Sequence, residues 1–270
     1  MASFKKYRVT TSEKFKLASI DPADTPFLKG DEEGQRERLE QLAGELDELQ
    51  NLLHAEGRRK LLLVLQGMDT SGKDGTIRWV FSRTSPLGVR VTAYKAPSED
   101  ERARDYLWRC HANVPRAGEI MVWNRSHYED VLVPWVEGWI DKQELSRRYA
   151  QIRDFERLLV ETGTVVVKCM LHISKATQRE RLQERIDDPG KRWKFRLDDL
   201  EVRNKWDAYQ RAYEQALRGT SSSYAPWNVI PADSKLHRNL MIAELLVKTL
   251  RNMELALPPA DPSLDGLHVK

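Results

Sequence analysis

Residues 61–76 read LLLVLQGMDTSGKDGT, an uninterrupted apolar run followed by a short polar loop. The apolar part, Leu61 to Leu65, is too short for a buried helix and does not alternate, so it predicts a central parallel strand covered on both faces. The loop from Gly67 to Lys73 fits the first seven positions of G-x-x-x-x-G-K-[ST], in which backbone N–H groups surround phosphate oxygens and the lysine neutralises them. The stretch therefore predicts a phosphate-binding loop, followed by a helix from Thr76 to Ser82 whose N-terminus faces the anion.

Asp74 occupies the position where the P-loop pattern has a hydroxyl group that contacts Mg²⁺. A carboxylate there adds negative charge close to the phosphate. It is tolerable only if a divalent cation lies between the two groups or the side chain turns away. A strand-to-helix turn that merely needs glycines is the alternative explanation of Gly67 to Gly75. The strand before the loop and the helix after it favour phosphate binding.

The composition is that of a soluble globular protein of one or two domains, with 270 residues, 40% hydrophobic and 31% charged. The net charge of +3 does not indicate a nucleic-acid binder. Cys110 and Cys169 form no C-x-x-C pair, which is typical of a reduced, cytoplasmic protein. The sequence contains no signal-peptide core and no apolar run of membrane-spanning length. We expect a cytoplasmic protein with neither a membrane nor a nucleic-acid partner.

Apolar runs alternate with helical patterns along the chain. The expected strands are 61–65, 89–93, 119–123, 164–171 and 227–231, and the expected helices include 35–54, 76–82 and 98–111. This alternation predicts an α/β fold of three layers, with a central parallel sheet. In such sheets the ligand lies beyond the carboxyl ends of the strands. The polar residues after strands 61–65, 119–123 and 164–171 should therefore meet over the phosphate-binding loop.

We expect three parts in the chain: an N-terminal arm and amphipathic helix (1–57), a P-loop kinase domain (58–257) and a loose C-terminal tail (258–270). The first 30 or so residues are polar and contain Pro22 and Pro26, which predicts an arm lying over the surface. The helix at 35–54 has one stripe of leucines, which favours packing on its own domain over contact with a second copy. Residues 175–215 are charged and helix-forming, with a break near Asp188-Pro189-Gly190, and predict a lid above the sheet.

Phosphoryl transfer needs anionic groups held in line, charge neutralised as it shifts, and water excluded. Lys73 and the loop backbone would hold phosphate, and Asp69 would ligate Mg²⁺ or orient the attacking phosphate. Arg125 follows the neighbouring strand, although it could instead pair with a carboxylate. The arginines of the lid could close over the site as a bidentate clamp, or form ordinary surface salt bridges; they are Arg179, Arg181 and Arg185.

Five segments between residues 61 and 235 occur in a specific order: GMDTSGKDGTIRWV, DYLWRCH, WNRSHYEDVLV, LHISKATQRERLQERIDDPGKRWKF and APWNVIPADSK. Together they resemble the polyphosphate kinase 2 family, in which the GKD form of the loop replaces the usual Ser/Thr. The resemblance implies a P-loop kinase fold with a helical lid. It also implies a homo-oligomeric enzyme that moves phosphate between inorganic polyphosphate and nucleotides with Mg²⁺, or with Mn²⁺ in its place. NRSHYED is similar to the class III subgroup, which phosphorylates AMP and ADP to give ADP and ATP.

Carried over by motif, the resemblance implies catalytic roles for Asp69, Lys73, Arg125 and Arg185. The implied nucleotide and phosphate contacts come from the loop and from the segment after the third strand: Gly67, Met68, Thr70, Ser71, Gly72, Asp74, Gly75, Asn124, His127 and Glu129. The implied metal ligands are Asp69, Asn124 and Glu129. Many family members have Asp where this chain has Asn124, so Glu129 or Asp130 would compensate for the missing carboxylate. Glu129 is also the candidate for influencing the choice of acceptor.

Polyphosphate is a linear polyanion without a base, so its site should be a groove of basic residues whose binding is sensitive to salt. The candidates are Arg116, Arg181, Lys191, Arg192 and Lys194. Two other functions share the loop. An ATP-dependent nucleoside monophosphate kinase would differ in its phosphate donor, and a nucleotide-binding switch would retain nucleotide without turnover. Nucleic-acid binding through the lid is disfavoured by the near-neutral charge.

Overall fold

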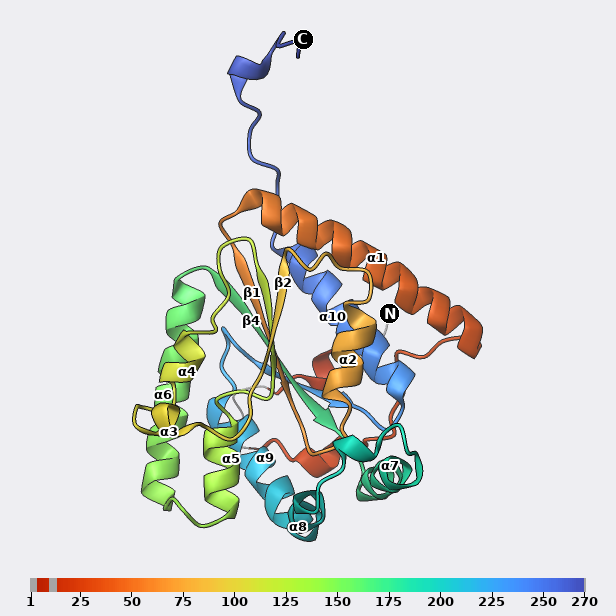
Figure 1. Cartoon of the computed structure of the whole chain (residues 1–270), viewed down its shortest axis with the longest axis vertical. Coiled ribbons are helices and arrows are strands. Elements are labelled where there is room, and N and C mark those ends of the chain that lie inside the picture. The colour runs from red at the N-terminus through yellow and green to blue at the C-terminus, as the bar shows by residue number, and fades with distance from the viewer. Residues whose placement is uncertain (1–3, 10–13, 270) are drawn as a thin grey trace.

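Five parallel strands form one sheet in the order β2-β3-β1-β4-β5 in the computed structural model, which describes residues 4–9 and 14–269 (Figure 1). The strands are β1 (Lys60–Gln66), β2 (Val89–Ala93), β3 (Ile120–Asn124), β4 (Thr164–His172) and β5 (Trp227–Pro231). All five predicted strands are confirmed. Leu63 of β1 pairs with Val122 of β3 and with Val167 of β4, so β1 is the central strand of the sheet.

Helices cover both faces of the sheet, which confirms the three-layer α/β architecture. One face carries α1 (Glu32–Glu56), α2 (Lys73–Val80) and α10 (Lys235–Asn252), and the other carries α5 (Glu129–Val136), α6 (Lys142–Glu161) and α9 (Trp206–Thr220). The shorter elements are α3 (Glu99–Arg102), α4 (Trp108–His111), α7 (Lys175–Asp187), α8 (Asp198–Asn204) and the 3-10 turns η1 (Phe4–Tyr7), η2 (Leu17–Ser19), η3 (Arg192–Lys194) and η4 (Pro262–Leu264). The carboxyl ends of the strands point toward α7 and α8 (Figure 1).

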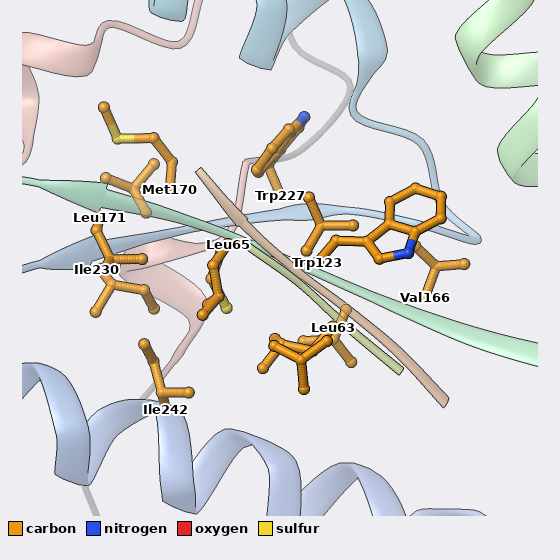
Figure 2. Close-up of a cluster of buried hydrophobic side chains, with 14 of the residues drawn as sticks. Leu63, Leu65, Trp123, Val166, Met170, Leu171, Trp227, Ile230 and Ile242 are labelled. Carbon is orange, nitrogen blue, oxygen red and sulfur yellow. The ribbon is translucent and has the colours of Figure 1, made fainter. Parts of the chain in front are cut away.

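The core lies on both sides of the sheet. Leu61 to Leu65 are completely buried, as expected for a strand that is apolar without alternation. Figure 2 shows Ile242 of α10 on one side of the strands and Trp227 of β5 on the other. Burying one such aliphatic side chain contributes roughly 1.5–3 kcal/mol. The strand that leads into the phosphate-binding loop is therefore anchored from both faces.

Helix α1 is fixed at both ends by its own sequence. Asp31 caps the N-terminus by accepting a hydrogen bond from the backbone of Gly34 at 2.9 Å, and Gly57 ends the helix with a φ of 65°. The leucine stripe is buried against α10. The prediction that this helix packs on its own domain is confirmed.

The expected helix at 98–111 is two short helices, α3 and α4, and this correction has a local cause. The side chain of Asp105 accepts a hydrogen bond from the backbone N–H of Leu107 at 3.0 Å. Such an Asx turn offers the backbone an alternative to continuous helix. The chain therefore turns between α3 and α4.

The N-terminal arm is more than a polar surface segment. Tyr7 and Val9 are buried, and Val9 is hydrogen-bonded through its backbone N–H to Trp227 of β5 at 2.8 Å. The hydroxyl of Ser221 donates to the carbonyl of Val9 at 2.6 Å. The arm thus covers the edge of the sheet at β5 and belongs to the core, which corrects the sequence-based expectation.

The predicted lid, residues 175–215, is shorter in the structure because its C-terminal part belongs to the core. Trp206 and Tyr213 of α9 are buried, and α9 packs against α5 and α6. Of the region predicted as a lid, only α7, η3 and α8 lie beyond the sheet edge, whereas residues 206–215 belong to the core. The tail at 258–269 is exposed and leads away from the body (Figure 1). Within the described ranges, no helix combines the length and apolar character needed to cross a membrane.

Candidate active site

The loop between β1 and α2 is packed so tightly that two of its glycines have no room for a side chain. A Cβ atom on Gly67 would lie 2.6 Å from the carbonyl oxygen of Leu171. At Gly72, which has a φ of 100°, a Cβ atom would lie 1.8 Å from Nη1 of Arg238. Close packing at both positions, and the positive φ of Gly72, therefore require the glycines of the P-loop pattern.

Lys73 begins α2, and its side chain folds back under the loop. Its Nζ atom donates hydrogen bonds to the carbonyl oxygen atoms of Gly67 at 2.8 Å and Met68 at 3.3 Å. Burial, with a further contribution from the charge of Arg125, lowers the pKa of Lys73 to about 8. The ammonium group is charged at pH 7, and an anion beside it would favour that charged form further.

Arg125 lies between two carboxylates at the carboxyl end of β3. Its Nη2 atom is 2.6 Å from Oδ1 of Asp69, and its Nη1 atom is 3.2 Å from Oε2 of Glu129. Glu129 is held from its other oxygen by Nε2 of Gln66 at 3.0 Å. Glu129 first, and then Asp69, raise the pKa of Arg125, against an opposing effect of burial. The guanidinium is thus a fixed positive charge next to the phosphate-binding loop.

Asp74 turns toward Asn124, whose Nδ2 atom donates a hydrogen bond to Oδ1 of Asp74 at 2.6 Å. A neutral amide can donate to this carboxylate, whereas a second carboxylate at position 124 would repel it. The two departures from the general pattern, Asp74 and Asn124, therefore complement each other. The carboxylate of Asp74 is satisfied here by a side chain of the neighbouring strand.

The carboxylates of this region suit a hard divalent cation. In the described residues, no group of three or more His, Cys, Asp and Glu side chains is arranged to hold a metal ion. Mg²⁺ is usually bound by one or two carboxylates together with substrate phosphates and waters, so such a group is not required. Asp69 and Asp74 could supply these carboxylates. All four candidate ligands have side-chain partners here: Asp69 pairs with Arg125, Asp74 with Asn124, and Glu129 with Gln66 and Arg125.

The basic residues of α7, η3 and their connection contact other residues of the same region. Nη1 of Arg185 lies 3.6 Å from Oδ2 of Asp199 and donates to the carbonyl of Lys194 at 3.2 Å. The remaining contacts pair Lys191 with Glu184 and Asp188, Arg192 with the carbonyl of Ile186, and Lys194 with the ring of Trp193. Arg179 lines a surface cavity with acidic residues of α7. A polyphosphate groove made by these residues stays a prediction.

Arg181 lines a surface cavity between α1, α7 and the start of α10 and is also bound to the backbone. Its guanidinium donates to three backbone carbonyls, those of Thr70 at 3.0 Å, Ala232 at 2.9 Å and Asp233 at 2.7 Å. These contacts join α7 to the phosphate-binding loop and to the start of α10. In the structure, Arg181 therefore supports the loop through its carbonyl oxygens, and its role in polyphosphate binding stays a prediction.

Two predicted site residues lie elsewhere. Arg116 precedes β3 and donates from its backbone to Glu119 at 2.7 Å, at the amino ends of the strands and therefore opposite the loop. His127 is 1% exposed and packs against the rings of Trp123, Tyr128 and Phe155. The structure therefore brings neither side chain to the loop, and the substrate contacts assigned to these two residues stay predictions.

The expectation that polar residues after three strands meet over the loop is confirmed by the contacts of Asp69 and Asp74 above, and by Nε2 of Gln178, which donates to the carbonyl of Asp69 at 3.3 Å.

Sequence reasoning missed Gln66, Gln178 and Arg238. Gln66 has a usable signal, since it is the one polar residue that closes the apolar run. The other two carry no such signal because they lie more than a hundred residues from the loop.

Comparisons with known proteins agree with one another. The model of the family described as "Polyphosphate kinase 2 (PPK2)" matches residues 29–258. The chain is 50% identical to the AMP/ADP-polyphosphate phosphotransferase of Meiothermus ruber over 98% of this chain and 100% of that protein. It is 39% identical to the ADP-polyphosphate phosphotransferase of Rhodopseudomonas palustris, over 96% and 93%. A crystal structure of polyphosphate kinase 2 from Arthrobacter aurescens TC1 superposes with a TM-score of 0.91 at 44% identity, covering 95% of this chain and 92% of that one.

Proposed function

The chain belongs to the polyphosphate kinase 2 family, and from this membership we propose that it transfers a phosphoryl group from inorganic polyphosphate to AMP and ADP, giving ADP and ATP. Both acceptors are proposed because the relative with 50% identity is named for AMP and ADP together. The reaction is an in-line transfer without a covalent enzyme intermediate.

Each proposed role follows from the position of the side chain. Lys73 and the backbone of the loop bind phosphate oxygens, with the ammonium group already drawn into the loop by Gly67 and Met68. Arg125, oriented by its two carboxylate partners, contacts the equatorial oxygens of the transferring phosphoryl group. Arg185 contributes charge from α7 when the lid region moves toward the loop. Together these cations hold two polyanions in line.

The carboxylate of Asp69 faces Arg125 and orients it toward the transferring group. Asp69 and Asp74 would also hold Mg²⁺, or Mn²⁺ in its place, among phosphate oxygens. When bound, the cation supplies charge neutralisation between donor and acceptor phosphates. Glu129 acts through Arg125, because it fixes the second edge of the same guanidinium.

One observation carries the proposal: the Arg125 guanidinium, 2.6 Å from Asp69, stands at the carboxyl end of the strand next to the loop that holds Lys73. A nucleotide-binding switch needs the loop and its lysine but has no use for a preset cation at the transferring group. The geometry therefore favours catalysis over mere retention of nucleotide.

The proposal is tested in the absence of ATP. Purified protein is mixed with Mg²⁺, AMP and long-chain polyphosphate, and the nucleotides are followed by anion-exchange chromatography. We expect ADP to appear first and ATP after it. The Lys73→Ala protein, prepared identically, should form neither, and this control excludes contaminating adenylate kinase.

Other outcomes revise the proposal in defined ways. If AMP is unchanged while ADP gives ATP, the polyphosphate donor is retained and AMP is removed as an acceptor. If neither nucleotide reacts and ATP phosphorylates AMP in a parallel reaction, the protein is an ATP-dependent monophosphate kinase. Retention of nucleotide without any turnover would identify a binding switch.

The wider expectations belong to the same proposal. A cytoplasmic place is supported by the two free thiols, Cys110 and Cys169, both of which are buried. A homo-oligomer is supported by exposed apolar side chains on and just before the edge strand β2, namely Leu87 and Val91. We propose neither a nucleic acid nor a membrane as partner.

A further inference from the structure

The carbonyl side of the phosphate-binding loop is occupied by side chains along its whole length. Each carbonyl oxygen from Gly67 to Ser71 accepts a hydrogen bond from a side-chain nitrogen. The donors are Lys73 for Gly67 and Met68, Gln178 for Asp69, Arg181 for Thr70 and Arg238 for Ser71. In a trans peptide the N–H group points away from the C=O group, and none of the peptides in the described ranges is cis. The loop is therefore held through its carbonyl oxygens, and its N–H groups point away from these donors, except that of Ser71, which donates to the carbonyl of Met68 at 3.1 Å.

Arg238 is a buried cation whose hydrogen-bond partners are all neutral. It is 3% exposed, on α10, and its Nε and Nη2 atoms donate to Oδ1 of Asn239 at 3.1 and 2.9 Å. Among the residues that the structure describes, no carboxylate lies within 4.0 Å of its guanidinium nitrogens. Burial, and secondarily the charge of Arg181, lower the pKa of Arg238 to about 9, so the group remains charged at pH 7. A buried cation without a paired anion is costly to the fold.

The guanidinium of Arg238 lies directly against the backbone of the phosphate-binding loop. Nη1 of Arg238 donates to the carbonyl of Ser71 at 3.2 Å and lies directly behind Gly72, where a Cβ atom would be 1.8 Å from it. Nη2 lies behind Gly75, 3.2 Å from a Cβ atom built there. The charge is thus separated from the phosphate side of the loop by a single layer of backbone.

We propose that Arg238 is a positioning residue for the phosphate site, which acts through the Ser71–Gly72 peptide group and whose charge is matched when polyphosphate occupies the loop. By donating to the carbonyl of Ser71, Arg238 fixes this peptide and polarises it. The N–H of Gly72 belongs to the same planar peptide group and points in the opposite direction, and it becomes a stronger donor. This inference rests on the proposed function, since it assumes that the loop binds phosphate.

The test measures binding of tripolyphosphate to the full chain by isothermal titration calorimetry at one fixed salt concentration. Arg238→Met removes the charge and the donors, and we expect it to weaken binding by about tenfold or more, as for loss of a charged hydrogen bond. Arg238→Lys keeps the charge but not the fork of donors, and should weaken binding by roughly threefold. Arg251→Met is the matched control on the same helix. That side chain is 65% exposed and pairs with Glu45, and its removal should leave the Kd unchanged.

A second readout separates positioning from a purely structural role. In Arg238→Lys the KM for polyphosphate should rise while the KM for AMP changes little. A structural role would lower the melting temperature and leave the Kd of the folded protein as in the wild type. That result overturns the proposal.

The outcomes distinguish this inference from the proposed function. If the wild type binds no tripolyphosphate, the proposed function fails. If the wild type binds and folded Arg238→Met binds within twofold of it, only the role of Arg238 is overturned. Should Arg238→Met not fold, Arg238→Lys decides, and an unchanged Kd in that variant overturns the proposal.

Discussion

Thr70 and Arg125 are two non-glycine residues in the left-handed region of backbone conformation, with φ of 66° and 63°. That conformation costs such a residue roughly 1–3 kcal/mol. The two lie at the ends of neighbouring strands, on either side of Asp69. The backbone N–H of Arg125 also donates to the carbonyl of Leu65 at 3.0 Å, and its side chain is held by two carboxylates. The guanidinium is therefore preorganised and loses little freedom when it meets a phosphate.

Glu129 should influence which acceptor is used. In Glu129→Asn, the Nη1 edge of Arg125 loses its ionic partner. AMP offers one phosphate, so its transfer depends more on the placement of Arg125 than that of ADP, whose second phosphate is held by other cations. We expect kcat/KM for AMP to fall about tenfold more than for ADP, a difference of ~1.4 kcal/mol. Initial rates with each acceptor at saturating polyphosphate measure it.

The control for this variant is Glu161→Gln, an exposed carboxylate at the end of α6, which should leave both acceptors unaffected. Equal losses for AMP and ADP in Glu129→Asn would remove Glu129 from any selective role.

At the scale of elements, one buried polar network joins β4, α6 and the start of α5 behind the site. Nζ of Lys168 lies 2.6 Å from Oε2 of Glu156, 3.0 Å from the hydroxyl of Tyr128 and 2.9 Å from the carbonyl of Thr220. Burial raises the pKa of Glu156, but Lys168 and His127 outweigh it and hold that pKa below its ordinary value. Tyr128 follows Arg125 by three residues, so the network also anchors the segment that carries Arg125.

Breaking this network from one side should be costly. Lys168→Met leaves the Glu156 carboxylate buried without its cation, and we expect the free energy of unfolding to fall by about 3–5 kcal/mol. The double variant Lys168→Met/Glu156→Met removes both charges and should lose clearly less than the sum of the two single variants. Urea unfolding followed by circular dichroism measures all three. Additive losses would show that the two groups do not act as a pair.

The sequence predicts elements better than it predicts contacts between them. Buried parallel strands can be recognised in the sequence because their side chains are apolar on both faces. The pattern of β4 remained recognisable although it contains Lys168. The loop with its Asp69, and Arg125 after the next strand, could be placed near each other because motifs locate them at the carboxyl ends of predicted strands. The support from Gln178 and Arg238 could not be found, since only the fold brings α7 and α10 behind the loop. Arg116 was assigned to the site on charge alone, and charge does not indicate which end of the sheet a residue occupies.

On the scale of the whole molecule, the N-terminal arm covers the β5 edge of the open sheet. Residues at the two ends of the chain are brought together, since Arg8 forms an antiparallel bridge with Asn228 of β5. An open strand edge is a template for pairing with other chains, and natural proteins cover such edges. The arm performs this function at the β5 edge, while β2 forms the opposite edge.

Removing the anchor of the arm should destabilise the fold without changing the chemistry. Tyr7 is 2% exposed, and its hydroxyl donates to Asp24 at 2.6 Å. We expect Tyr7→Ala to lower the free energy of unfolding by about 3 kcal/mol, as for other buried aromatic residues. The KM for AMP should be unchanged in the folded protein. Lys16→Ala, an exposed position of the same arm, is the control for urea unfolding, and equal stability of the two variants would contradict the anchoring role.

The contact between the arm and β5 can form only after both segments have been synthesised. Val9 is made more than two hundred residues before its partner Trp227. At about 5–20 residues per second, this delay is roughly ten to forty seconds. Throughout that time, Tyr7 and Val9 are apolar side chains without their final burial site. The nascent chain thus presents a segment suited to a chaperone until β5 has been made, and the β5 edge of the sheet is covered only after that point.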